Sequence, residues 1–87
     1  MKVLAKGIEM VSWINLEGII TPVRFKIENE DSSNSVVKID KVITVDKERL
    51  AGNNMLLYTC QSVIRGSERI FSLKYSYETC KWMLWKL

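Results

Sequence analysis

The stretch that decides the fold is residues 56–75, LLYTCQSVIRGSERIFSLKY. Apolar and aromatic side chains recur at every second position on both sides of Gly66, which is the period of a half-buried β-strand. With Gly66-Ser67 as a two-residue turn, Cys60 lies opposite Leu73 on an apolar face, and the reverse face is mainly polar. The stretch therefore predicts a β-hairpin with one buried face.

A second hairpin is predicted over residues 8–27, with Glu17-Gly18 as its two-residue turn. On this register one face is almost entirely apolar. The other face pairs Glu9 with Lys26, which have opposite charges, and Trp13 with Pro22. A slip of one residue would lose both features, so the pattern indicates this pairing.

Two further segments complete the sheet. A hairpin around Glu78-Thr79 places Leu73 opposite Leu84 and continues the ribbon. Residues 36–46 read as one long strand whose alternation slips near residues 40–41, which indicates either a bulge or a bend between two sheets. Residues 47–50 are expected to form one helical turn.

Together these segments predict an all-β protein with six strands in a mostly antiparallel meander. The 87 residues are enough for one compact β-barrel-like domain over residues 1–87, with 47% hydrophobic residues to supply a core. An open sheet of this length would leave an apolar face uncovered. We therefore expect the meander to curl into a small barrel or to fold into two short packed sheets.

The residue inventory indicates no enzyme class, and we expect neither a cofactor nor a metal site. The chain contains no His, which excludes Ser-His-Asp and Cys-His arrangements within one chain. The predicted register places Cys60 and Cys80 about 13 Å apart, beyond the reach of a disulfide, so two separate buried free thiols are expected. Residues 28–31 form an acidic loop that is expected to be solvated, with a hard-cation site as the alternative.

The same inventory bears on location. No run approaches the roughly 20 apolar residues that cross a membrane. Lys6 and Glu9 interrupt the apolar stretch that a signal peptide would need. We therefore expect no membrane association and a cytoplasmic protein with both thiols reduced.

The net charge of +3 comes entirely from the C-terminal part of the chain. Residues 1–64 hold 8 basic and 8 acidic side chains, whereas residues 65–87 hold 5 basic and 2 acidic ones. Basic residues interleaved with aromatic ones on a β-barrel are typical of single-stranded nucleic-acid binding, with Trp85 as the stacking platform. In the opposing interpretation the aromatic residues belong to the core and the basic ones to its solvated reverse face. The basic residues concerned are Arg65, Arg69, Lys74, Lys81 and Lys86.

Apolar residues on the outer faces favour a different function. In the predicted phase, Trp82 and Leu84 point inward, so the residues between and after them point outward together with Trp13. Either the segments 2–6 or 47–53 cover these side chains, or they form a protein interface. The leading hypothesis is a non-enzymatic module that acts through protein contacts, by self-association or by partner docking. The interface residues it names are Trp13, Met83, Trp85 and Leu87.

Overall fold

A computed structural model describes the backbone of residues 1–87 and every side chain except that of Leu50. It confirms the predicted all-β class, since the described backbone contains strands and turns but no helix. The seven strands are β1 (Val3–Ile14), β2 (Ile20–Glu28), β3 (Asn34–Lys38), β4 (Lys41–Leu50), β5 (Asn53–Ile64), β6 (Ser67–Ser76) and β7 (Trp82–Lys86).

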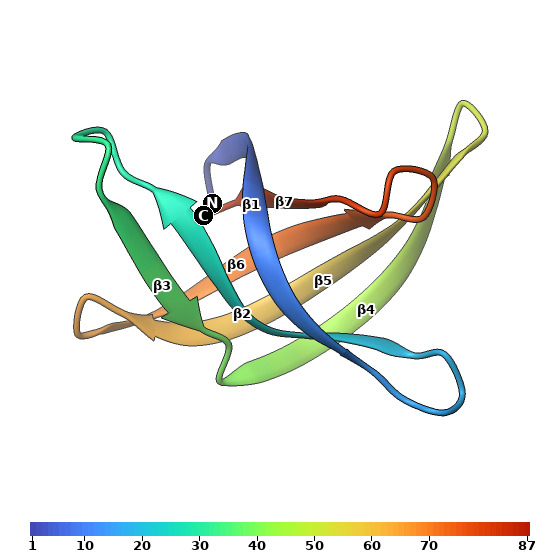
Figure 1. Ribbon diagram of the computed structural model, residues 1–87, viewed down its shortest axis with the longest axis horizontal. Coiled ribbons are helices and arrows are strands. Elements are labelled where there is room, and N and C mark those ends of the chain that lie inside the picture. Colours follow the sequence, from blue (N-terminus) through green and yellow to red (C-terminus); the bar gives the residue numbers. More distant parts are fainter.

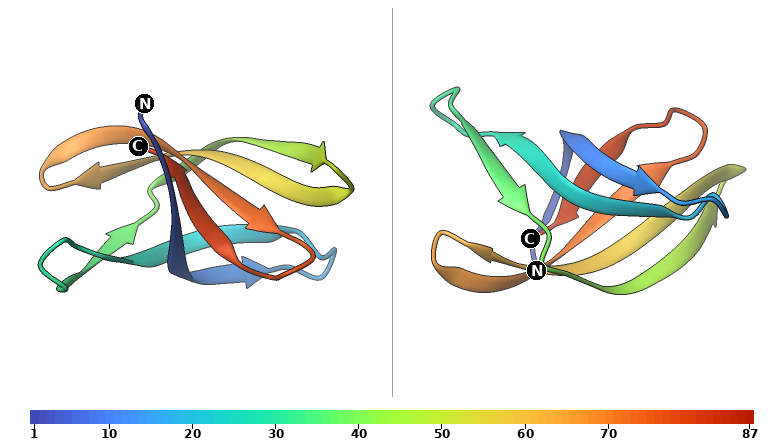
Figure 2. Two further views of the ribbon diagram at one scale, coloured as in Figure 1. Left: turned by 90° about the horizontal axis from the view of Figure 1, so that it is seen from above. Right: turned by 60° about the horizontal axis from the view of Figure 1, so that its bottom comes forward.

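The strands form one curled sheet in the order β3-β2-β1-β7-β6-β5-β4, and all neighbours are antiparallel. Figure 1 shows the sheet as a half-barrel, and Figure 2 shows its two ends folded toward each other. β1 links the two halves because its first part pairs with β7 and its last part with β2. The chain ends lie side by side, with backbone hydrogen bonds of 2.8 and 3.0 Å between Lys2 and Leu87.

The strand expected over residues 36–46 is divided into β3 and β4, which is why the sheet has seven strands and not six. The two strands lie at opposite ends of the strand order, and only Ile39 and Asp40 separate them along the chain. The Ile39 N–H donates to the carbonyl oxygen of Val23 at 3.0 Å, and a carboxylate oxygen of Asp40 accepts from the N–H of Val63 at 3.0 Å. The slip in alternation therefore marks a corner, where the chain leaves β2 and joins β5.

The hairpin of β1 and β2 follows the predicted register only in the part distant from its loop, from Glu9 to Val11. Glu9 lies opposite Lys26, and their charged groups are 3.2 Å apart. Beyond Val11 the register shifts by one residue at a bulge, so Trp13 lies opposite Thr21 and not opposite Pro22 as predicted. The connection between the strands is a five-residue loop, residues 15–19, and not a two-residue turn.

The hairpin of β5 and β6 turns at Arg65-Gly66, not at Gly66-Ser67 as predicted. Both turn residues have positive φ, 52° and 77°, which is the geometry of a type I′ turn. Cys60 consequently pairs with Phe71 and not with Leu73. The offset is an even number of residues, so every side chain keeps its predicted face.

The ribbon between β6 and β7 has the predicted register, with Leu73 opposite Leu84. The predicted helical turn over residues 47–50 is wrong, because this segment belongs to β4 and pairs with β5. A tight turn at Ala51 and Gly52, both with positive φ, follows it directly. The ladder to β5 satisfies backbone groups that a single helical turn would leave to water.

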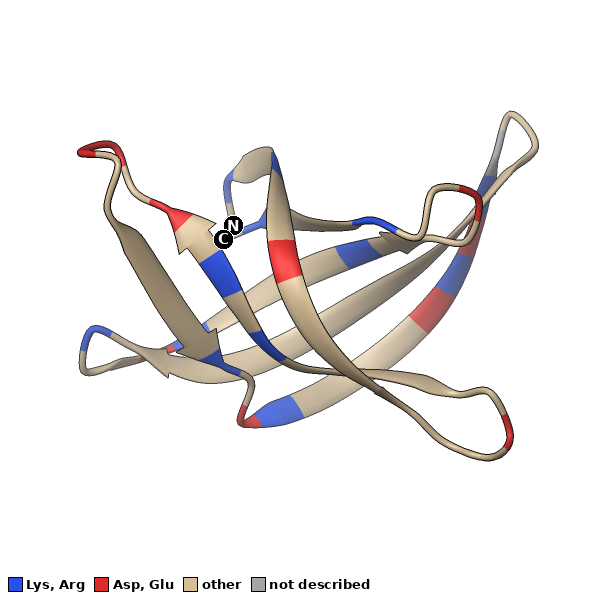
Figure 3. Ribbon diagram, in the orientation of Figure 1, with Lys and Arg blue, Asp and Glu red and all other residues tan. Residues whose placement is uncertain are grey.

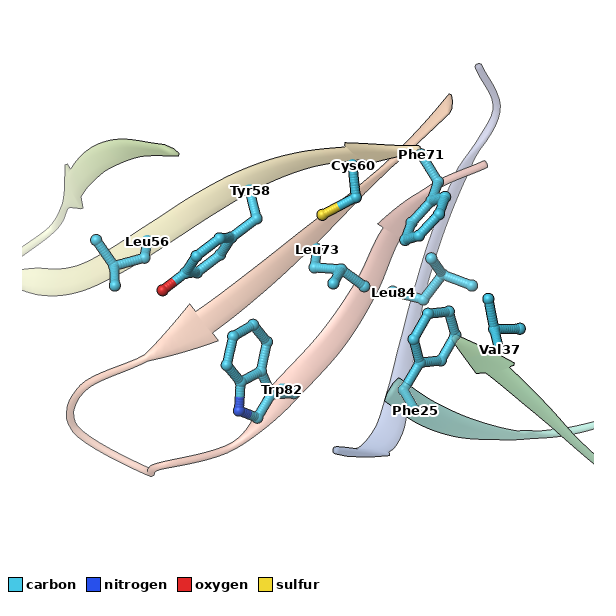
Figure 4. Packing of buried hydrophobic residues seen from close by; sticks show 9 residues of the cluster. All are labelled: Phe25, Val37, Leu56, Tyr58, Cys60, Phe71, Leu73, Trp82 and Leu84. Carbon is cyan, nitrogen blue, oxygen red and sulfur yellow. The ribbon is translucent and has the colours of Figure 1, made fainter. Parts of the chain in front are cut away.

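The core lies on the concave face of the sheet and is drawn in Figure 4. Phe25 and Phe71 meet edge to face with ring centroids 5.7 Å apart, which joins the two halves of the barrel. The Tyr58 hydroxyl donates to the carbonyl oxygen of Ile20 at 2.5 Å, again across the barrel. The buried residues are Phe25, Val37, Leu56, Tyr58, Cys60, Phe71, Leu73, Trp82 and Leu84.

The two thiols differ in their surroundings. Both are free, as predicted, and Cys60 is buried in the core, where burial raises its pKa to about 12. The prediction that Cys80 is also buried is wrong. Cys80 has positive φ and lies in the turn between β6 and β7, where its N–H donates to the carbonyl oxygen of Ser76 at 2.8 Å, so its side chain is held outside the barrel.

Candidate interaction surface

Five exposed apolar side chains lie on the projecting end of the β1–β2 hairpin. We call this end, residues 11–23, the arm. Figure 1 shows it extending past the other strands at the lower right. Trp13 is 67% exposed and Ile14 62%, although in sequence they resemble core residues. The exposed apolar residues of the arm are Val11, Trp13, Ile14, Leu16 and Ile19.

Strand length explains why the arm is uncovered. The pairing of β1 with β7 ends where Ile8 meets Trp82, because β7 has only five residues against twelve in β1. The pairing of β2 with β3 reaches only to Arg24. In the described backbone, most of the arm therefore has no third strand beside it. Its exposed apolar residues have no opposing layer to pack against, whereas Ile20 at its base packs against the core.

The loop at the tip of the arm is nevertheless ordered by its own hydrogen bonds. The side-chain oxygen of Asn15 accepts from the N–H of Glu17 at 3.0 Å and from the N–H of Ile19 at 2.9 Å. The Asn15 carbonyl accepts from the N–H of Gly18, which has a positive φ of 81°. This Asx-type arrangement holds Leu16 out in solvent.

The predicted interface residues do not form one surface. Trp13 is on the arm, whereas Met83 lies opposite Gly7 and is half-buried on the outer face of β7. Trp13 lies six positions along β1 from Gly7, which corresponds to about 20 Å along the strand. Trp85 is half-buried on the same outer face as Met83. The outward direction predicted for Met83 and Trp85 agrees with the buried positions of Trp82 and Leu84, the alternate residues of β7.

Trp85 is already engaged within the chain. The Lys74 ammonium lies 3.7 Å from the centroid of its ring, a cation–π contact. Lys74 also forms an ion pair with Glu48 at 3.3 Å, and its side chain is largely buried. These contacts join β4, β6 and β7 on the outer face and leave less of the indole available to a partner.

Leu87 does not point outward as predicted. Leu73 pairs with Leu84 but Ser72 pairs with Lys86, so β7 has one extra residue at Trp85. This bulge reverses the phase of the residues after it. Leu87 therefore packs against the core at one end of the barrel.

The predicted nucleic-acid residues are spread over the molecule. Arg65 and Arg69 line a cavity at one end of the barrel, and Lys81 lines another at the opposite end of β7. Lys74 is buried beneath Trp85, and Lys86 pairs with Val3 at the N-terminal end of β1. The five residues do not form one continuous basic strip, and nucleic-acid binding stays a prediction.

The acidic loop is organised by hydrogen bonds within it. The Asp31 carboxylate accepts from the N–H and the hydroxyl of Ser33, and these bonds lower the pKa of Asp31. Among the side chains that the structure describes, no three His, Cys, Asp or Glu residues gather as metal ligands would.

The sequence missed three residues of the arm, because the predicted register of the hairpin over residues 8–27 places Ile14, Leu16 and Ile19 on its apolar face. Only the relative lengths of the predicted strands carried a signal. A hairpin spanning residues 8–27 is longer than the segment after residue 80 that must lie beside it. Its end must therefore extend past that neighbour.

Comparisons of the chain with models of protein families, with curated proteins and with solved structures find no match. The protein is therefore classified by its fold alone, as a small antiparallel half-barrel with a projecting apolar arm. Within the described residues there is also no helix of the length and apolar character needed to cross a membrane.

Proposed function

We propose that this protein is a non-enzymatic β-barrel module that acts by protein contact, with the arm of a second copy of the chain docked on its own arm. The exposure of Trp13 carries this proposal. Contiguous apolar surface on a soluble protein is typical of an interaction site, and aromatic residues are enriched at the centres of interfaces. Leu16 and Ile14 extend the same apolar end of the hairpin.

The open edge of β1 supports a β-strand contact. In the described part of the sheet, Glu9–Ile14 pair with β2 on one side and with no strand on the other. A row of unpaired backbone groups is a template for pairing with another chain. Two copies related by a two-fold axis can join these edges in antiparallel fashion, since each copy offers the same strand.

The charge pattern of the arm favours a second copy as the occupant. Sheet edges are normally protected from self-pairing by charged side chains, Lys above all. Figure 3 shows the far part of the arm free of charge except for an acidic position at its tip, which is Glu17. Two arms can therefore approach along the uncharged stretch from Val11 to Ile14 without facing like charges.

Concentration-dependent mass measurement tests the proposal. In multi-angle light scattering and sedimentation equilibrium, we expect the wild-type chain to pass from monomer to dimer as its concentration rises. Burying a large apolar side chain contributes about 1.5–3 kcal/mol, and each substitution acts twice in a symmetric dimer. Trp13→Ser and Leu16→Ser should therefore each weaken dimerisation at least tenfold.

Ile70→Ser is the matched control, because Ile70 is also an exposed apolar residue but lies on β6, away from the arm. It should leave the dimerisation constant within about twofold. A wild-type chain that stays monomeric at millimolar concentration contradicts self-association. A dimer that Ile70→Ser weakens as much as Trp13→Ser contradicts the arm as its interface.

We also infer a cytoplasmic location for the module. The support is that Cys60 and Cys80 are both unpaired and that Cys80 is exposed. A reducing compartment keeps such a thiol free, whereas an oxidising one favours disulfide exchange at it. Recovery of Cys80 from cells in a disulfide would contradict this location.

A further inference from the structure

A cavity of about 590 Å³ opens at the end of the barrel where β5 turns into β6. We call it the mouth cavity. Its floor contains Phe25, Val37 and Leu84, which Figure 4 shows gathered at one end of the core. Leu87 completes the apolar wall, because the bulge at Trp85 turns it inward. Its volume falls within the range of about 300–1,000 Å³ that small-molecule sites occupy.

Two guanidinium groups stand at the rim of the mouth cavity. Arg69 pairs with Ser62, whose side chain is fully buried, so Arg69 is on the concave face, and Arg65 is in the adjoining turn. Among the described side chains, no carboxylate lines the mouth cavity, and neither arginine has a carboxylate within ion-pairing distance. Positive charge above an apolar floor is complementary to an anion that carries an apolar tail.

The turn presents Arg65 at some conformational cost. Type I′ turns favour Asn or Gly at both central positions, yet Arg65 occupies the first with a φ of 52°. An Arg in the left-handed region is sterically disfavoured relative to Gly. The cost is compatible with a role for this side chain at the rim.

We propose that the mouth cavity binds a small amphipathic carboxylate, with its apolar chain on the half-buried side chains of Ile64 and Leu87 and its carboxylate on the guanidinium of Arg69, assisted by Arg65. The planar guanidinium forms two parallel hydrogen bonds with a carboxylate, which fixes the head group of the ligand. The proposal does not depend on the arm, since the arm residues do not line this cavity.

Arg69 is the main anchor for an electrostatic reason. Arg65 also lines a neighbouring cavity that contains the acidic side chains Glu28, Glu30 and Asp31. These carboxylates compete with a ligand for Arg65 and reduce the positive potential on that side. Arg69 lines the mouth cavity and not its acidic neighbour.

Calorimetric titration of the full chain with three probes tests the proposal. Sodium octanoate has both a tail and a carboxylate, 1-octanol has only the tail, and sodium acetate has only the carboxylate. We expect octanoate to bind at least tenfold more tightly than either of the other probes. Amide shifts in NMR should move for Arg65–Arg69 and for Val37, and not for the arm. Equal affinity for octanol or for acetate would overturn the assignment, as would shifts located elsewhere.

Two variants of the mouth cavity and one control variant separate binding from folding. Arg69→Gln removes one charge at an exposed position and should weaken octanoate at least tenfold, since hydrogen bonds to charged groups contribute about 1.5–3 kcal/mol. Ser67→Trp should fill the rim from an exposed position of β6 and abolish binding. Lys81→Gln makes the same charge change at the other end of β7 and should leave affinity within twofold. Loss of binding in Lys81→Gln, or its retention in Arg69→Gln, would overturn the proposal.

Discussion

The β5–β6 hairpin and the arm of the β1–β2 hairpin share an alternating apolar pattern, but one is buried and the other is exposed. In both, apolar residues recur at every second position. In the first, Leu73 is completely buried because β1, β2 and β7 complete the barrel over it. In the second, Leu16 is fully exposed because the neighbouring strands end before they reach it. Alternation thus determines which face of a strand is apolar, and the lengths of its neighbours determine whether that face is buried.

Matched truncations of the two leucines make the largest expected difference. Leu73→Ala should lower the free energy of unfolding by about 2–5 kcal/mol, since it removes a buried side chain and leaves a cavity. Leu16→Ala should change it by no more than about 0.5 kcal/mol, because its side chain packs on nothing in the monomer. Urea denaturation at low protein concentration, where dimers are absent, measures both values. Equal losses in the two variants would show that the arm belongs to the folded core.

The inner faces of β5 and β6 could be predicted from the sequence, because the alternation of apolar and polar residues was enough to assign them. Cys60 was paired two residues away from its true partner, yet it points inward because an even offset preserves the face. The register of β6 with β7 was predicted correctly, although the residues expected to form its turn lie in a longer loop. Pairing is cooperative over several residues, so one weak turn does not decide it.

The features that place the candidate sites could not be predicted in the same way. The bulge at Trp85 depends on how β7 meets β1 and β6 together, and it alone turns Leu87 into the mouth cavity. The corner at Asp40 depends on acceptors and donors in β2 and β5 that are distant in the sequence. Both are tertiary effects, whereas alternation is a local signal.

Alkaline pH should destabilise the barrel body, by which we mean the strands outside the arm, through groups that the arm lacks. Burial raises the pKa of Cys60 from 9.0 to about 12 and that of Tyr58 from 10.0 to about 12, so the folded state favours their neutral forms. The two groups do not change the free energy of unfolding below about pH 9. They lower it as the pH rises from about 9 toward 12, because the unfolded chain releases these protons at a lower pH than the folded chain does. Unfolding by urea at a series of pH values measures this loss.

Two variants test whether the loss of stability at alkaline pH comes from the barrel body. Cys60→Ala should flatten the part of the profile that begins near pH 9, and Tyr58→Phe the part that begins near pH 10. Leu16→Ala should keep the wild-type profile, because the arm contains no thiol or phenol. A profile that stays unchanged in both body variants would contradict the assignment.

The smallest expected change in stability comes from the loop at the tip of the arm. Asn15→Ala removes the acceptor for the N–H groups of Glu17 and Ile19, which then bond to water. The free energy of unfolding should change by less than about 0.5 kcal/mol, since this loop can open while the barrel stays folded. Amide hydrogen exchange should accelerate several-fold at Glu17 and Ile19 and stay unchanged at Phe71.

Asn15→Asp is the control for this loop, because its carboxylate keeps the acceptor and should retain slow exchange. If the arm is also the dimer interface, Asn15→Ala should weaken dimerisation more than Asn15→Asp does, since an unrestrained tip loses more conformational freedom when it docks. Faster exchange at Phe71 in Asn15→Ala would show that arm and body open together. In that case the arm would be an extension of the cooperative fold and not a separate element, and the contrast between Leu16 and Leu73 would not hold.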